Sequence, residues 1–180
     1  MKIKRLLSSI RLMMIGDGYK KAEYLSKISK TDNIGQKVFW KINFIPSELE
    51  LIRIHNNVVI ASNVTFVTHD VFHYMLHNKY PDKIFRYELG CIEVEDNVCI
   101  GARTIIMPNV RIGHDCIIAA GSIITKDIPP DSVVAGVPAR IIGKTSDFEK
   151  KRERKCKDTR KTVDRYEECW RLFEEEREDI

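Results

Sequence analysis

The chain has 180 residues, of which 43% are hydrophobic and 31% are charged, and its formal net charge is +4. No apolar run approaches the roughly 20 residues of a membrane-spanning helix, and the basic residues do not alternate with aromatic ones over a long stretch. We therefore expect one globular domain with an appendage, with no integral membrane segment and no nucleic-acid partner.

The first thirty residues carry helical patterns. The apolar residues of the first segment fall on one helix face: Leu6, Leu7, Ile10, Met13 and Met14. Residues 19–30 could form a second short helix. Arg11 interrupts the apolar stretch and no small-residue cleavage site follows, so we do not interpret the segment as a signal peptide. Such a helix can bind a membrane surface; we expect instead that its apolar face packs on the body of the protein.

A six-residue period dominates the middle of the chain. Apolar residues recur at Val94, Ile100, Ile106, Ile112, Ile118 and Ile124, with Pro130 next in line. The fifth position of each hexad is small or of medium size: Val98, Thr104, Val110, Cys116, Ser122 and Ile128. This period fits neither an α-helix nor an alternating strand. It predicts a parallel β-helix in which three hexads close one triangular coil, with the fifth-position side chains under the corners.

The period has two breaks. It begins with Ile34, Trp40 and Pro46, after which two extra residues shift the register, and it resumes with Ile54, Ile60 and Phe66. Between Thr68 and Ile92 it disappears in an aromatic, histidine-rich segment. An insertion at a corner of a solenoid projects as a loop, and such loops often carry function.

The tail from Ser146 onwards predicts a long charged helix. Its apolar residues have heptad-like spacing: Cys156, Val163, Tyr166, Trp170 and Phe173. We expect this stripe to pack on the body or on a neighbouring subunit. Three parts follow: an N-terminal helical cap at 1–33, a β-helix domain at 34–144 with a loop at 70–91, and a C-terminal helix at 145–180. The terminal helices would cover the open ends of the coil.

The five cysteines form no CxxC pair, and Cys116 falls on a core position of the hexads. This pattern argues against a disulfide scaffold. We therefore expect a reducing compartment, the cytoplasm.

The segment AAGSIITKDIPPDSVVAGVPARIIGK at 119–144 resembles the hexapeptide-repeat acyltransferases, in particular the galactoside, maltose, chloramphenicol and capsular-polysaccharide O-acetyltransferases. The resemblance covers about residues 34–144. It implies a mainly β protein, a left-handed parallel β-helix. It also implies a homotrimer with active sites between subunits, and acetyl-CoA as co-substrate with no metal.

The resemblance also implies a set of acetyl-CoA contacts: Ala102, Ala120, Thr125, Lys126 and Arg140. The chemistry agrees, because lysine and arginine pair with phosphates. Three glycines would allow close backbone approach along one corner of the coil: Gly101, Gly113 and Gly121. The chain departs from the family at Gly143, where relatives often have a second basic residue, and at Cys99, where many have Trp.

His69, in SNVTFVTHD, matches the place of the family's catalytic histidine. Because a free imidazole titrates near neutral pH, it can remove a proton from a sugar hydroxyl during direct transfer. Asp70 is the residue that we expect to orient His69 or to bind a hydroxyl. Tyr74 and Tyr87 are further candidates for acceptor binding, since aromatic rings stack on sugar faces.

The expected activity is O-acetylation of a sugar or polysaccharide-precursor hydroxyl. N-acetylation of an amino sugar and O-acetylation of an antibiotic remain open, because they need the same base and groove. A different class is a zinc-dependent hydratase on the same scaffold: His69, His73 and His77 are four residues apart and would align on a helix. A catalytically inactive scaffold is the third hypothesis, although His69 and the TKD and PAR elements are all present.

Overall fold

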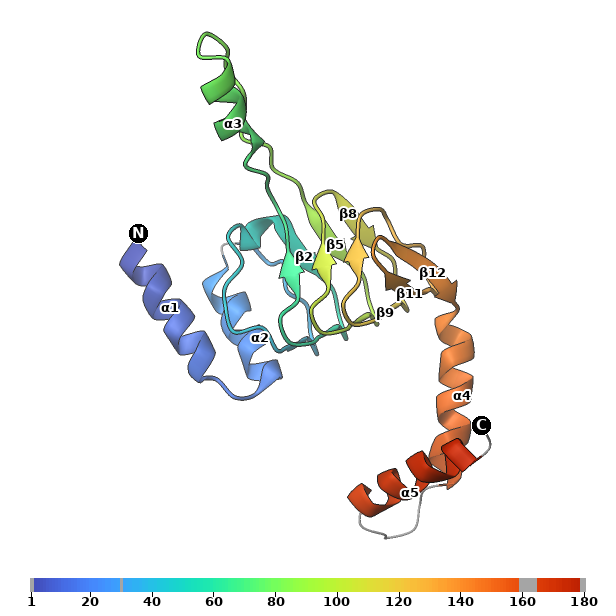
Figure 1. Cartoon of the computed structure of the whole chain (residues 1–180). Helices are drawn as coiled ribbons and strands as arrows, with labels where there is room; N and C mark the ends of the chain where they lie inside the picture. Colours follow the sequence, from blue (N-terminus) through green and yellow to red (C-terminus); the bar gives the residue numbers. More distant parts are fainter. Residues whose placement is uncertain (1, 30, 159–164, 179–180) are drawn as a thin grey trace. The chain divides into compact units, whose positions relative to one another are not determined.

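The computed structural model describes residues 2–29, 31–158 and 165–178. By the contacts between its residues the chain divides into two compact units, Met1–Thr145 and Ser146–Ile180. The larger unit is a parallel β-helix of short strands, preceded by two helices and interrupted by a projecting loop (Figure 1).

The strands stack into three sheets. One contains β1 (Phe39–Trp40), β3 (Val59–Ile60), β6 (Cys99–Ile100), β9 (Ile117–Ile118), β11 (Val133–Gly136) and β12 (Ala139–Gly143). A second contains β4 (Thr65–Phe66), β7 (Ile105–Ile106) and β10 (Ile123–Ile124), and the third β2 (Ile52–Ile54), β5 (Ile92–Val94) and β8 (Val110–Ile112). All pairs are parallel except β11 with β12, and Ile106 lies beside Ile124, so three hexads close one coil as predicted.

The predicted columns form the core. The first-position residues from Val94 to Ile124 are at most 1% exposed, and the fifth-position residues are buried as well. Thr104 and Ser122 satisfy their buried hydroxyls by donating to the carbonyl oxygens of Gly101 and Ala119, both at 2.8 Å. The column ends at Ile124, however, because Pro130 is exposed, so the extension of the period to Pro130 is wrong.

Most corners of the coil contain one residue in the left-handed region of backbone conformation. These residues recur at the fourth position of the hexads: Asn57, Asn63, Asn97, Arg103, Asn109, Asp115 and Gly121. Asparagine, aspartate and glycine tolerate positive φ best among the residue types. The residues that form these corners therefore recur with the same six-residue period as the buried apolar residues.

Two helices precede the coil: α1 (Lys2–Met14) and α2 (Gly18–Ile28). Asp17 caps α2 by accepting a hydrogen bond from the backbone N–H of Lys20, and α2 packs on β1, with the rings of Tyr19 and Phe39 5.2 Å apart. Among the α1 side chains whose burial the structure describes, residues 5–14, only Leu12 enters the core. The expectation that its apolar face packs on the body is wrong, because Leu6, Leu7, Ile10, Met13 and Met14 are 46–82% exposed.

The insertion between β4 and β5 projects from the coil and contains α3 (Phe72–Lys79) (Figure 1). Its two stems pair as antiparallel neighbours at His69 and Leu89, and the N–H of Gly90 donates to the carbonyl oxygen of Thr68 at 2.8 Å. Backbone hydrogen bonds at the neck therefore hold His69 at the base of the loop.

The second unit contains α4, which begins at Thr145 (Thr145–Asp158), and α5 (Arg165–Glu178). Both helices lie within the segment for which the sequence predicts one long helix, and residues 159–164 between them lie outside the described residues. Within the second unit, Tyr166, Trp170 and Phe173 are 45–79% exposed. Val163 and the side chain of Cys156 lie outside the described residues. No described helix is long and apolar enough to cross a bilayer.

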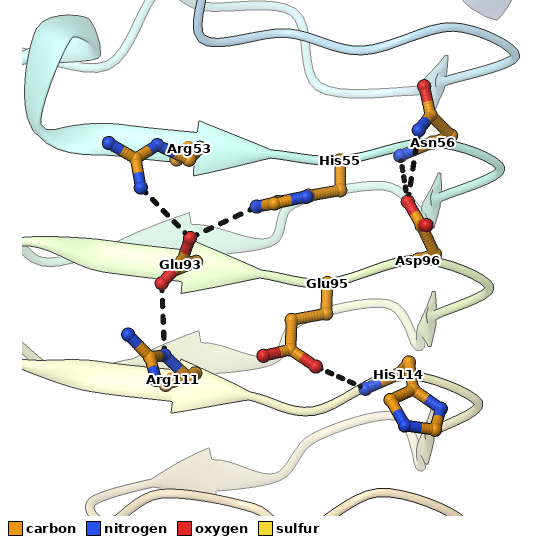
Figure 2. A network of polar contacts seen from close by, with 8 residues as sticks. All are labelled: Arg53, His55, Asn56, Glu93, Glu95, Asp96, Arg111 and His114. Carbon is orange, nitrogen blue, oxygen red and sulfur yellow. Dashed lines mark hydrogen bonds and ion pairs between the residues drawn. The ribbon is translucent and has the colours of Figure 1, made fainter.

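The outer face of the β2–β5–β8 sheet carries a ladder of charges (Figure 2). Arg53, Glu93 and Arg111 are cross-strand neighbours in register. The Glu93 carboxylate accepts from Arg53 Nη1 at 3.0 Å and from Arg111 Nε at 2.9 Å, and it lies 3.0 Å from His55 Nε2. The hydrogen bond to His55, against the effect of burial, and then the two arginines hold the pKa of Glu93 below its ordinary value.

Candidate active site

His69 pairs with a carboxylate from another turn of the chain. Its Nδ1 lies 2.9 Å from Glu48 Oε2, and the hydroxyl of Thr68 donates to the same oxygen at 2.5 Å. The two side chains are about a quarter to a third exposed. Nδ1–H donates to the carboxylate, which fixes the tautomer and leaves Nε2 as the basic nitrogen. Within the described residues Nε2 has no hydrogen-bond partner.

The charge of Glu48 follows from its surroundings. Burial alone would raise the pKa of this carboxyl, but hydrogen bonds from Thr68 and His69, with the charges of His69 and Arg5, hold the pKa below its ordinary value. Arg5 also donates from Nη2 to the carbonyl oxygen of Pro46 at 3.0 Å, two residues before Glu48. Glu48 is therefore ionised at neutral pH and can keep the imidazole oriented.

Glu48, and not Asp70, is the carboxylate that is hydrogen-bonded to His69. The Asp70 carboxylate instead accepts a hydrogen bond from the backbone N–H of Phe72 at 3.2 Å, at the start of α3. Sequence reasoning missed Glu48, which lies in the first break of the period, residues 46–54, just before the short 3₁₀ helix Leu49–Leu51. A carboxylate inside that two-residue register shift is the signal that could have identified it.

The candidate acceptor residues differ in their proximity to His69. The ring of Tyr87 lies 5.3 Å from that of His69 and 5.2 Å from that of His73. Partial burial, and then the nearby Glu48 carboxylate, raise the pKa of the Tyr87 hydroxyl, which stays protonated and able to donate. Tyr74 is 65% exposed, and the centre of its ring lies 4.1 Å from that of His73, with the ring planes tilted by 38°. The structure thus places Tyr87 beside His69, with Tyr74 one ring further away.

The three histidines do not form the arrangement that a zinc site requires. His69 precedes α3, so it does not share a helix face with the other two. His77 Nε2 accepts a hydrogen bond from the backbone N–H of Phe85 at 2.9 Å, which occupies its lone pair. Among the described residues no group of three or more potential ligands could hold a metal ion. The helical alignment assumed for the hydratase alternative is therefore wrong.

Three predicted acetyl-CoA contacts line one cavity of about 410 Å³: Thr125, Lys126 and Arg140. Asp127 also lines it, but its Oδ1 accepts from the backbone N–H of Arg111 at 2.8 Å. Arg140 donates to the carbonyl oxygen of Ala139, and no described carboxylate forms an ion pair with Arg140 or Lys126. Two cations at one cavity wall fit a phosphate-bearing ligand.

The other two predicted contacts, Ala102 and Ala120, lie at a different corner. The N–H of Gly121 donates to the carbonyl oxygen of Ala102 at 2.8 Å, so the two alanines stack on successive coils. A Cβ at Gly101 would collide with the backbone of Ala120, so glycine is required there. Gly113 lies against Pro130 instead, and the prediction that all three glycines follow one corner is wrong.

His69 and the cavity share one corner of the coil. β4, β7 and β10 are neighbours in register, with Phe66 beside Ile106 and Ile106 beside Ile124. His69 lies three residues after the end of β4, and Thr125 and Lys126 directly follow the end of β10. All three residues are therefore at the same corner of the coil. Two strand spacings are about 10 Å. A long, thin ligand running along this corner could therefore reach both.

The short parallel strands and the six-residue period define a hexapeptide-repeat β-helix. Residues 92–126 match the family model described as "Bacterial transferase hexapeptide (six repeats)". Over these residues the chain carries the repeat of the hexapeptide-repeat transferases.

Similar proteins carry the same fold. Galactoside O-acetyltransferase of Escherichia coli is 39% identical over 119 residues, 66% of this chain and 56% of that protein. A solved galactoside acetyltransferase in complex with coenzyme A has a TM-score of 0.57 at 26% identity, covering 83% of this chain and 84% of that one. A hexapeptide-repeat acetyltransferase of Vibrio cholerae, complexed with acetyl coenzyme A, shares the fold at a TM-score of 0.56 and 22% identity, over 79% and 86%. The chain spans about half the length of the curated relatives it matches.

Proposed function

We propose that the protein transfers an acetyl group from acetyl-CoA to a hydroxyl of a sugar or polysaccharide precursor. The observation that carries the proposal is the pair formed by His69 and Glu48, in which an ionised carboxylate holds Nδ1 and leaves Nε2 for a substrate proton. The names of the similar proteins support the reaction class and the galactoside relatives support a sugar acceptor.

The proposed mechanism is direct transfer with general-base catalysis. Acetyl-CoA supplies an acetyl group that is activated as a thioester. His69 Nε2 accepts the proton of the acceptor hydroxyl as its oxygen attacks, and the resulting imidazolium later donates that proton to the departing sulfur. Glu48 stabilises the imidazolium through Nδ1–H while the positive charge is present. Lys126 and Arg140 would bind the phosphates and Thr125 would contact the rest of the cofactor. Ala102 and Ala120, which lie at a different corner, would contact it from a neighbouring subunit of the proposed trimer.

The acceptor would lie at the base of the projecting loop. Tyr87 supplies an aromatic face and a protonated hydroxyl beside His69. Tyr74 and Asp70 extend the same side, although the Asp70 carboxylate is engaged with Phe72. We assign acceptor selection to this loop.

We further propose a left-handed coil and a homotrimer with active sites between subunits, as in the family that its motifs resemble. The cysteines Cys91, Cys99, Cys116 and Cys169 are free. Free thiols are typical of a reducing compartment, so they support cytoplasmic action.

The proposal is tested by thiol release from acetyl-CoA with a panel of sugars, amino sugars and chloramphenicol. Wild type and His69→Ala are compared, and His77→Ala serves as the matched control because the Nε2 of His77 is already engaged in the loop. We expect turnover on a sugar that falls by about 10²–10⁴ only in His69→Ala. Turnover that survives this substitution contradicts the assigned base, and preference for an amine changes the acceptor class.

A further inference from the structure

We propose that the exposed apolar face of α1 docks on the surface of a membrane that contains anionic lipids. Leu7 is 60% exposed, Met13 61% and Met14 82%, and Leu6 and Ile10 are exposed on the same face. At 100° per residue these five side chains fall within an arc of about 120°. Together they form a continuous apolar stripe along a helix, which differs from scattered single exposed residues.

The opposite face of α1 attaches the helix to the body, so the stripe points away from it. Leu12 is fully buried in the core. Arg5 donates to the carbonyl oxygens of Pro46 and Ile45, and the guanidinium of Arg11 lies 5.3 Å from the centre of the Tyr24 ring. The helix is therefore held with its apolar stripe directed outward.

The positive charge of α1 indicates that its apolar face binds an anionic lipid surface. Its sequence contains Lys2, Lys4, Arg5 and Arg11 and no acidic residue. A helix with an apolar stripe and basic residues lies in the plane of the membrane interface and is attracted by anionic lipid head groups. Its 13 residues extend about 20 Å, which suits a helix that lies along a surface.

A second helix with exposed apolar residues provides the contrast. In α5, Trp170 and Phe173 are exposed beside Glu167, Glu174 and Glu175, which are exposed as well. An acidic helix is repelled by anionic lipids, so the proposal is restricted to α1. This inference rests on exposure and charge and not on the proposed acetyl transfer.

The test is flotation of the full-length protein with lipid vesicles of two compositions. One contains phosphatidylcholine alone and the other contains phosphatidylcholine with phosphatidylglycerol, each at low and at high salt. The α1 variant is Leu7→Ser/Met14→Ser, and the matched control is Ile84→Ser/Ile142→Ser, which removes two apolar residues exposed at 93% and 65% elsewhere. All four positions are exposed, so folding should be retained, as circular dichroism can verify.

We expect wild type and control to float with phosphatidylglycerol vesicles at low salt, and the α1 variant to bind at least about tenfold more weakly. A third variant, Lys2→Gln/Lys4→Gln, should lose the preference for phosphatidylglycerol. Wild type that stays unbound, or an α1 variant that binds like the control, overturns the proposal. Loss of self-association in the α1 variant by sedimentation velocity, without vesicle binding, would identify the face as an interface between copies and also overturn it.

Discussion

The regular coil and the two breaks in its six-residue period differ in what they contribute. In the coil every first-position side chain from Val94 to Ile124 is buried, and the column provides stability without presenting a reactive group. The breaks present polar side chains at a corner: residues 46–54 supply Glu48, and residues 68–92 supply His69 and Tyr87. The candidate catalytic pair thus joins the two places where the repeat is interrupted.

This difference has a physical reason. In a hexad the inward positions are fixed by packing and the corner position by a left-handed backbone, which leaves little freedom for a functional side chain. An insertion relaxes both requirements locally, while the coils on either side hold it in place. The coil can therefore hold a catalytic base at an irregular corner while the packing of its own inward-facing side chains stays the same.

The largest expected effect is on stability, to which we expect the regular coil to contribute much more than the breaks. Ile106→Ala should lower the free energy of unfolding by about 3 kcal/mol, because Ile106 is fully buried in the column and a cavity would remain. Ile84→Ala, in the second break and 93% exposed, should change it by less than about 0.5 kcal/mol. Urea denaturation of both variants measures the difference. Equal midpoints would show that the column does not dominate stability.

The second prediction is that a substitution in the first break lowers activity while leaving stability nearly unchanged. Glu48→Gln keeps the size of the side chain and removes the charge that stabilises imidazolium, so kcat should fall about tenfold to a hundredfold. KM for acetyl-CoA and the unfolding midpoint should change little. Glu50→Gln, at an exposed position of the short helix that follows Glu48, is the control. Equal kcat values for the two variants would remove Glu48 from the proposed mechanism.

The same contrast explains what could be predicted from the sequence. The strand columns follow from Ile and Val at fixed spacing, because burial at that period has one structural solution. The partner of His69 could not be found in this way, since Glu48 is brought to it by a register shift and not by spacing. The outward face of α1 was also missed: the pattern shows that its apolar residues share a face but not which side Leu12 and Arg5 attach to the body.

A third prediction concerns the regular part of the site, where Lys126 and Arg140 line the cavity beyond β10. Lys126→Gln/Arg140→Gln should raise KM for acetyl-CoA about tenfold or more, because two charge-assisted phosphate contacts are lost. The effect on kcat should be smaller than that of Glu48→Gln. Initial rates at varied acetyl-CoA and at varied acceptor distinguish the two. A rise confined to the acceptor KM would assign the cavity to the acceptor instead.

The smallest expected effect tests the charge ladder of the regular coil. Glu93→Gln removes a carboxylate that meets Arg53, Arg111 and His55, and should lower the free energy of unfolding by about 0.5–1 kcal/mol at pH 7, since both arginines are largely exposed and screened by solvent. The folded-state pKa of Glu93 is lowered from 4.5. Its contribution is therefore fully present above that pH and is lost as the pH falls through the lower folded value. The difference between wild type and Glu93→Gln should accordingly shrink in acid and in high salt, whereas Glu50→Gln should show neither trend. A difference that persists in acid would mean that Glu93 acts through packing and that the ladder adds no charge-dependent stability to the coil.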